Sequence, residues 1–252
     1  MASAAGGSGA ECALKCELQF VRCCSAAAFV SETKTCIFSA EGNADFSSLV
    51  PGGSVYRKDK RRPDAGTFRL VQADGRTFQV IQHRSKGCLS FARGWVEYVR
   101  GFSDDTDFWT GLHKIHQLTG SSPKTLRVEA TTWSDVLYVG EYSGFSVGSA
   151  INSYTMNYGS YLSSSSNMTS DSLAHNNGMQ FSTMDRDNDG HSASCSVSRG
   201  NAGWWFKACS RSNPNGLYRD TASTDMHSVY WTGATSGSNE ALKSIRLMLQ
   251  LA

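Results

Sequence analysis

Three carboxylates alternate along one short segment of the chain, at Asp185, Asp187 and Asp189, and Gly190 follows directly after them. Side chains this close together repel one another unless a cation lies between them, and a dense set of hard oxygen ligands suits calcium. The pattern matches the first half of an EF-hand loop, but its twelfth position is Ser196, where a bidentate Glu is required. The run is therefore either a calcium site of another kind or a solvated acidic turn.

Two cysteines follow the acidic run and enclose a group of aromatic residues. A bond between Cys195 and Cys209 would close a loop of about 15 residues and contribute about 3 kcal/mol in the chain-entropy model. Inside this loop lie three consecutive aromatics, Trp204, Trp205 and Phe206, which cannot all point into one core. Two interpretations stay open: plain packing against the disulfide, or a ligand pocket with an apolar wall beside the acidic run.

No residue pattern indicates an enzyme. His113 and His116 lie near each other on an expected helix, but the acid and the third ligand of a zinc hydrolase are missing. The sequence also has no G-x-S-x-G nucleophile elbow. We therefore expect a binding protein without catalytic residues.

The composition indicates an extracellular protein. The chain has 252 residues and 8 cysteines, and the cysteine spacing does not match a zinc site, so we expect disulfides formed in an oxidising compartment. A sequon at Asn167 predicts N-glycosylation on a surface loop. A formal net charge of +2 is too small to indicate nucleic acid or an acidic membrane surface as a partner, and no apolar run is long enough to span a bilayer.

The residue composition divides the chain into four parts. Residues 1–10 are Ala, Gly and Ser with little else and predict a flexible tail without the features of a signal peptide. If the protein is secreted, three explanations stay open: a fragment, an engineered piece or a wrong gene start. Residues 11–55 are rich in cysteine. Residues 56–65 hold a basic run closed by Pro63, which predicts a solvated linker, a processing site or a polyanion patch. Residues 66–252 form a strand-rich domain.

The expected elements follow from hydrophobic periodicity and turn residues. In the cysteine-rich part we expect a helix over 11–20 and strands over 27–30 and 35–38. In the strand-rich part we expect a hairpin around Asp74-Gly75, helices over 89–100 and 108–118, and strands over 126–130, 137–139, 153–161 and 244–251. The stretch 163–238 is rich in Ser, Gly, Asn and Asp, yet it holds many aromatics, so we expect a disulfide and an ion to order it.

Motifs in the strand-rich part resemble the fibrinogen C-terminal domain, in the order that this family has them. They include Lys86-Gly87-Cys88, Trp95, Glu97-Tyr98, Gly101-Phe102, Phe108-Trp109, Leu126-Arg127-Val128, Asn177-Gly178-Met179, Gly203-Trp204-Trp205 and Asn215-Gly216. The resemblance covers roughly residues 66–251. It implies an α+β fold with a twisted, mainly antiparallel sheet, few short helices and a loop-rich calcium-binding subdomain.

The resemblance also implies a calcium site. In this family the last two carboxylates of the acidic run and two main-chain carbonyls hold the ion. The matching positions are Asp187 and Asp189 and the carbonyls of His191 and Ala193, with Asp185 supporting the loop. Calcium is the only cofactor that we expect.

A ligand pocket is implied next to the second cysteine. The resemblance implies a disulfide between Cys195 and Cys209 and, from many members, a cis peptide bond between Ala208 and Cys209. Ficolin- and tachylectin-like members bind acetyl groups beside that peptide. The matching wall here consists of Cys195, Trp204, Cys209, Ser210, Tyr230 and Trp231. The sequence departs from the family at Ser210, where a His is frequent, and at 239–242, where an expected aromatic is missing, and both departures concern acetyl specificity.

The cysteine-rich part is similar to a piece of a PAN/apple module, in which a helix with two cysteines is bonded to neighbouring strands. The pairing of its cysteines and of Cys88 stays open. One hypothesis bonds Cys12 to Cys36 and Cys16 to Cys23 or Cys24, and leaves the remaining cysteine for Cys88.

From these observations we expect a calcium-dependent extracellular recognition protein, with lectin-like binding of acetylated or other glycans in innate defence or agglutination. The alternative is an adhesion or receptor-ligand protein that binds a protein receptor through the same fold. A shallow pocket holds a small sugar by few contacts, so we expect weak single-site affinity and a homo-oligomer that supplies avidity.

Overall fold

The computed structural model describes residues 2–5, 26–30, 33, 35–39, 55–57, 69–104 and 106–251. The chain divides into two compact units, 1–62 and 63–252. No helix among the described residues is long and apolar enough to cross a membrane.

The first unit contains a four-stranded antiparallel sheet with the order β1-β3-β2-β4. Its strands are β1 (Ala2–Ala5), β2 (Ala26–Val30), β3 (Thr35–Ser39) and β4 (Val55–Arg57). Strands β2 and β3 confirm the two strands predicted there. Cys36 and Phe38 alternate on one face of β3 and are buried. The helix predicted over 11–20 and the cysteines at 12, 16, 23 and 24 lie outside the described residues.

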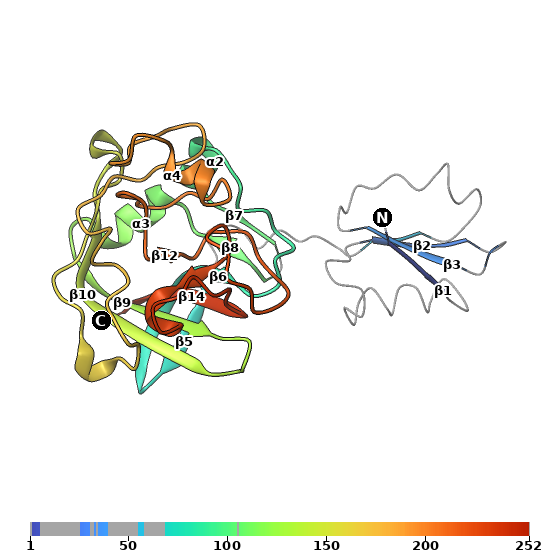
Figure 1. Ribbon diagram of the computed structural model, residues 1–252, viewed down its shortest axis with the longest axis horizontal. Helices are drawn as coiled ribbons and strands as arrows, with labels where there is room; N and C mark the ends of the chain where they lie inside the picture. The colour runs from blue at the N-terminus through green and yellow to red at the C-terminus, as the bar shows by residue number, and fades with distance from the viewer. Residues whose placement is uncertain are drawn as a thin grey trace. The chain divides into compact units, whose positions relative to one another are not determined.

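The second unit contains a large sheet with short helices and many loops (Figure 1). Its strands are β5 (Leu70–Ala73), β6 (Arg76–Arg84), β7 (Phe102–Ser103), β8 (Phe108–Trp109), β9 (Lys124–Thr131), β10 (Leu137–Val147), β11 (Met156–Asn157), β12 (Ser212–Asn213), β13 (Tyr230–Trp231) and β14 (Ser244–Gln250). Its helices are α2 (Trp95–Arg100), α3 (Leu112–Thr119), α4 (Cys195–Ser198), η1 (Ala150–Asn152), η2 (Ser163–Ser165) and η3 (Thr232–Ala234).

The large sheet has the order β11-β10-β9-β14-β6-β8-β7, with β5 paired to β6, and its pairs are antiparallel. The C-terminal strand β14 therefore lies between β9 and β6, at the centre of the sheet. The predicted hairpin is present as β5–β6. Asp74 and Gly75 have φ values of 50° and 72°, which a tight two-residue hairpin turn requires at both central positions.

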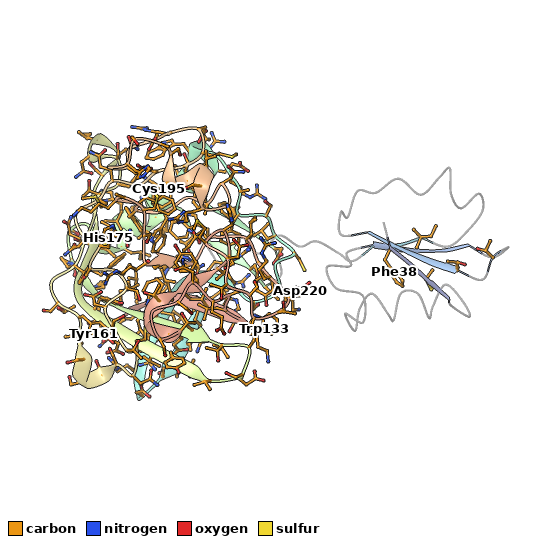
Figure 2. All side chains as sticks on the ribbon, in the orientation of Figure 1. Phe38, Trp133, Tyr161, His175, Cys195 and Asp220 are labelled. Atoms are coloured by element: carbon orange, nitrogen blue, oxygen red, sulfur yellow. A yellow bond between two sulfur atoms is a disulfide. The ribbon has the colours of Figure 1, made fainter. Side chains whose placement is uncertain are left out.

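Strand β14 shows how the two faces of the sheet are used. Ile245, Leu247 and Leu249 are 1% exposed and join the main core. Met248 points to the opposite face, where it packs in a second, smaller cluster with Phe78, Val80 and Phe108. This second cluster explains the one apolar residue that broke the predicted alternation of the strand. Side chains fill the space between the sheet and the loops that cover it (Figure 2).

Three predicted elements differ from the structure, and the backbone gives the reasons. The segment 108–118 begins as strand β8, and the helix starts only after Gly111, whose φ of 103° is not helical. The helix predicted over 89–100 likewise starts after Gly94. The strand predicted over 153–161 is reduced to β11, because Ser153 and Tyr154 are left-handed, with φ of 51° and 53°.

Residues 148–243, here called the loop-rich half, contain only short elements. They are nevertheless packed into the main core of the unit, through Leu173, Phe181, Trp204, Trp205 and Trp231. Helix α4 lies near α2, at the end of the unit away from the β5–β6 hairpin (Figure 1). The acidic run and both of the predicted bonded cysteines belong to this half.

Candidate functional site

The candidate site is built around one disulfide. Cys195 and Cys209 are bonded, with their Cα atoms 5.4 Å apart, and the peptide Ala208–Cys209 is cis. Both features confirm what the family resemblance implied. Cys36 and Cys88 are also part of disulfides, and no described cysteine carries a free thiol.

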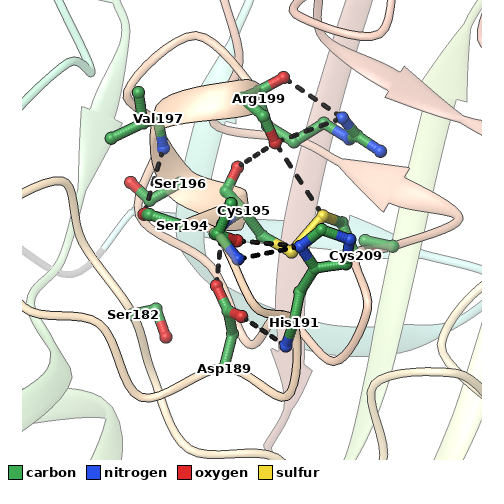
Figure 3. Close-up of a disulfide and its surroundings, with 12 residues drawn as sticks. Ser182, Asp189, His191, Ser194, Cys195, Ser196, Val197, Arg199 and Cys209 are labelled. Carbon is green, nitrogen blue, oxygen red and sulfur yellow. Dashed lines mark hydrogen bonds between the residues drawn. A yellow bond between two sulfur atoms is a disulfide. The ribbon is translucent and has the colours of Figure 1, made fainter.

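The acidic loop is joined to this disulfide through Asp189 (Figure 3). One oxygen of its carboxylate accepts the main-chain N–H of His191 at 2.8 Å, and the other accepts that of Cys195 at 2.8 Å. Cys195 begins α4, so the carboxylate fixes the loop against the first residue of that helix. The loop and the disulfide therefore form one structural unit.

The carboxylates of Asp187 and Asp189 lie next to each other. Burial raises the pKa of Asp189 above its ordinary value, the N–H groups of His191 and Cys195 oppose this, and the Asp187 carboxylate raises it further. An oxygen of Asp187 accepts the N–H of Asp189 at 3.1 Å, which keeps the pair in place. Two adjacent acidic groups of this kind are stabilised by a shared cation.

The main-chain oxygens expected to complete the site lie on the same loop. Among the described residues, no hydrogen bond ends on the carbonyl of His191, and the carbonyl of Ala193 contacts only the His191 ring, at 3.0 Å. The described residues hold no cluster of three or more Asp, Glu, His or Cys side chains suited to one metal. A hard cation would thus be held by two carboxylates together with main-chain oxygens, a donor set that fits calcium.

Asp185 has a different position from the other two carboxylates. It accepts the Thr183 hydroxyl at 2.6 Å and the N–H of Trp95, the first residue of α2, at 2.9 Å. These bonds, the one from Thr183 first, lower the pKa of Asp185. Gly94 makes the approach possible, since a Cβ there would lie 2.6 Å from the Asp185 carboxylate. Asp185 thus ties the acidic loop to α2.

The predicted pocket wall is assembled, but its aromatic residues face inward. Trp204 is 1% exposed, and Tyr230 and Trp231 are 0% exposed. The rings of Trp204 and Trp205 pack edge to face with centroids 4.9 Å apart. Trp204, Trp205 and Phe206 all lie in the same core, so the expectation that three consecutive aromatics cannot all point into one core was wrong. The segment is irregular there, and its side chains are not held to the alternating directions of a strand. The burial agrees with the alternative that the aromatics pack against the disulfide. Of the six wall residues, only Ser210 is more than slightly exposed.

Ser210 is held by its neighbours. Its hydroxyl lies 2.6 Å from the carbonyl of Ser212 and 2.9 Å from Oδ1 of Asn176, and it accepts the N–H of Ser212 at 3.0 Å. The hydroxyl of Tyr230 donates to the carbonyl of Ser210 at 3.2 Å. The segment after Cys209 is therefore fixed from both sides by hydrogen bonds.

Arg199 borders the disulfide and was not singled out from the sequence. Its Nη1 donates to the carbonyl of Ser198 at 3.1 Å and lies 3.1 Å from the sulfur of Met226. The hydroxyl of Ser198 in turn lies 3.8 Å from the sulfur of Cys209. In the sequence, only the position of Arg199 four residues after Cys195 marks it as part of the site, because its contact Met226 lies 27 residues further along the chain.

The sequon residue Asn167 is exposed, yet its side chain is engaged. Its Oδ1 accepts the N–H of Val139 at 2.6 Å, and its Nδ2 donates to the carbonyl of Leu137 at 3.2 Å. The carboxamide thus pairs with the free edge of β10 much as a neighbouring strand would, which protects that edge. Glycosylation at Asn167 stays a prediction.

Comparisons with known proteins agree with this architecture. A family model described as fibrinogen beta and gamma chains, C-terminal globular domain, matches residues 52–251. "Fibrinogen-like protein A" of Apostichopus parvimensis is 35% identical over 207 residues, which is 79% of this chain and 70% of that protein. Human "Angiopoietin-related protein 7" is 35% identical over 191 residues, which is 75% of this chain but only 54% of the relative.

One similar solved structure carries a ligand. Lamprey fibrin D-dimer, complexed with the peptide Gly-His-Arg-Pro-amide, has a TM-score of 0.64 and 29% identity. The match covers 73% of this chain and 64% of that chain.

Proposed function

The chain belongs to the fibrinogen C-terminal domain family, and from this we propose that it is a calcium-dependent extracellular recognition protein that binds glycans. The observation that carries the proposal is the hydrogen bond from the N–H of Cys195 to the Asp189 carboxylate, which joins the acidic loop to the disulfide. An ion on that loop acts directly on the segments that border the exposed rim of the site. The predicted activity is non-covalent binding, with no catalytic residue.

Calcium has a defined task in this proposal. Asp187 and Asp189, with the carbonyls of His191 and Ala193, would hold the ion, which supplies positive charge between the two carboxylates. The chain itself fixes the loop through the N–H groups bonded to Asp189 and through Asp185 on α2. The ordered loop then holds α4 and the disulfide in one position for a ligand.

Protein binding is the second candidate function. Burial of Trp204, Tyr230 and Trp231 leaves little aromatic surface for an acetyl group, which favours a flatter contact. The lamprey fibrin structure, which has a similar fold, holds a peptide as its ligand. A homo-oligomer, secretion and a PAN/apple-like first unit belong to the same proposal.

Calorimetric titration of calcium, followed by N-acetylglucosamine, into the oxidised protein tests the proposal. We expect calcium to bind, and the sugar to bind only to the calcium form. If calcium binds and no acetylated sugar does, protein binding becomes the better candidate. If calcium does not bind, the assignment of Asp187 and Asp189 is wrong.

A further inference from the structure

The sequon at Asn167 lies beside an apolar segment that the proposed recognition function does not use. Val136 and Leu137, where the β9–β10 turn enters β10, are 45% and 49% exposed. They begin the run 136–140, Val-Leu-Tyr-Val-Gly, which has no charge and no Pro and is rich in residues that favour strands. Runs of this composition at the edge of a sheet pair readily with other chains and aggregate. The start of β10 is therefore a segment that needs protection in the folded protein.

The free edge of β10 is covered differently along its length. Its last residues pair with β11, and its middle bonds to individual residues of the segment 159–166. Nearest the turn, the described cover consists of Asn167 and the N–H of Met168. The main-chain N–H of Asn167 donates to the carbonyl of Val139 at 2.9 Å, and its carboxamide bonds to the N–H of Val139 and the carbonyl of Leu137. A single side chain thus ends the cover where the exposed apolar run begins.

The residues of the sequon are held rigidly on the fold. Met168 is 7% exposed and lies over Gly140, where a Cβ would be 2.7 Å from its sulfur. The N–H and the hydroxyl of Thr169 donate to the carbonyl of Gly233 at 2.8 and 3.1 Å. Asn167 itself is exposed, and among the described residues its Nδ2 has one acceptor for its two hydrogens. A group attached to Nδ2 therefore leaves the protein surface at a defined point on the edge of β10.

We propose that Asn167 carries an N-linked oligosaccharide, which covers the exposed start of β10 and keeps it from pairing with other chains. In the attachment step Nδ2 loses one proton and bonds to the anomeric carbon of N-acetylglucosamine, and the lipid-linked pyrophosphate that carried the sugar leaves. Nδ2 keeps its other N–H for a hydrogen bond. The inference rests on the extracellular location in the proposed function, and neither calcium nor a bound ligand enters it.

The position of Nδ2 gives the sugar two effects on this edge. Nδ2 lies 3.2 Å from the carbonyl of Leu137, so the first sugar ring lies next to that residue. The C–H face of the ring can pack on the aliphatic side chain while the hydroxyl groups stay in water. A second strand would have to approach β10 to about 4.8 Å, and a bulky hydrated group at this point excludes it.

Occupancy of the sequon is the first measurement. The full chain is produced behind a secretion leader in a eukaryotic host, and peptide N-glycosidase converts each glycosylated Asn to Asp, which mass spectrometry of the peptides detects. Asn167 is the only sequon in the sequence, so every N-linked sugar is read at one position. We expect Asn167 to be occupied. An unmodified Asn167 in the secreted protein would overturn the inference.

The second measurement compares Thr169→Val, which removes the sequon and leaves Asn167 in place, with Thr169→Ser, which keeps the sequon and a hydroxyl group. We expect Thr169→Val to aggregate severalfold faster on warming and to bind more anilinonaphthalene sulfonate, whereas Thr169→Ser behaves as the parent does. Melting temperatures show that both variants are folded. Aggregation of Thr169→Val at the rate of the parent would contradict the protective role.

A rescue experiment locates the effect on β10. Leu137→Thr, added to Thr169→Val, should return aggregation to the rate of the parent, because the surface that the sugar covers is then less apolar. Leu70→Thr in the same background is the matched control, since Leu70 is 56% exposed but lies on β5, which pairs with β6. Equal rescue by the two substitutions would overturn the inference. Failure of calcium to bind would count against the proposed function and leave these aggregation rates unaffected.

Discussion

The sheet and the loop-rich half of the second unit satisfy their main-chain polar groups in different ways. Strands β6, β9, β10 and β14 do so through one another, in continuous antiparallel ladders. The loop-rich half has few ladders, so its carbonyls accept isolated main-chain N–H groups in turns and single bridges, and several buried ones accept side-chain amides. Asn176 Nδ2 donates to the carbonyl of Trp205 at 2.6 Å, and Asn215 Nδ2 donates to that of Gly203 at 2.9 Å.

The sheet uses buried charge where the loop-rich half uses buried amides. Arg127, on β9, is 5% exposed and bonds to Glu129 and to Glu141, which is 1% exposed, at 2.8 Å each. Arg76 and Arg246 complete the cluster from β6 and β14. The comparison teaches that a regular sheet can carry costly ion pairs on one face, whereas an irregular segment is held by individual hydrogen bonds from buried amides and from carboxylates such as those of Asp185 and Asp189.

The largest expected effect is in the sheet. Arg127→Met leaves Glu129 and Glu141 buried with one cation fewer, and we expect the free energy of unfolding to fall by about 3 kcal/mol. Urea denaturation measures this loss. A loss below about 1 kcal/mol would show that Arg76 and Arg246 alone neutralise the two carboxylates.

The same variant has a pH signature. Burial alone would raise the pKa of Glu141, but the bonded guanidinium groups of Arg76 and Arg127 hold it below its ordinary value. Stability from this group is therefore present above the unfolded pKa and lost as pH falls through the folded pKa. The parent should lose more stability than Arg127→Met on acidification, so that the two denaturation curves approach each other.

The second effect concerns the disulfide of the loop-rich half. Replacing Cys195 and Cys209 together by Ala should reduce the free energy of unfolding by about 3 kcal/mol at most, through the greater entropy of the unfolded chain. We also expect weaker calcium binding, because Asp189 is bonded to the N–H of Cys195. Unchanged calcium affinity in the double variant would separate the acidic loop from the disulfide.

The third effect tests the buried asparagine side chains of the loop-rich half. Asn176→Leu leaves the carbonyl of Trp205 buried without its donor, which should cost about 2 kcal/mol. Asn157→Ala, at an exposed position of β11 without a side-chain hydrogen bond, is the control and should change stability by less than about 0.5 kcal/mol. Equal losses in the two variants would contradict the role given to buried asparagines.

The smallest effect is the change in stability caused by Asp187→Asn, and calcium reverses its sign. Asp187→Asn keeps an oxygen for the N–H of Asp189 but removes the charge that raises the pKa of Asp189. Because that folded pKa is raised, the calcium-free parent loses stability as pH rises through it, and the variant loses less. Without calcium the variant should be more stable at neutral pH by about 0.5 kcal/mol, and in saturating calcium it should be less stable. Melting temperatures with calcium and with a chelator measure both.

Local pattern was sufficient where a short segment decides its own conformation. Asp74-Gly75 predicts the turn of β5–β6, and the alternation of Ile245, Leu247 and Leu249 predicts β14, because both depend on neighbours in the chain. The motif order predicts the family. The start of α3 was misplaced, since Gly111 needs its φ of 103° where the backbone of Arg100 approaches it.

The sequence by itself therefore determined the fold class, the acidic loop and, through the motif order, the bonded cysteines. Only the tertiary structure decided which side of that disulfide is exposed. Three consecutive aromatics can face a pocket or a core, and segments distant in sequence bury Trp204 and Trp205. The same packing leaves Arg199 and Met226 at the rim. Side-chain direction in an irregular segment depends on long-range contacts, and no local periodicity records them.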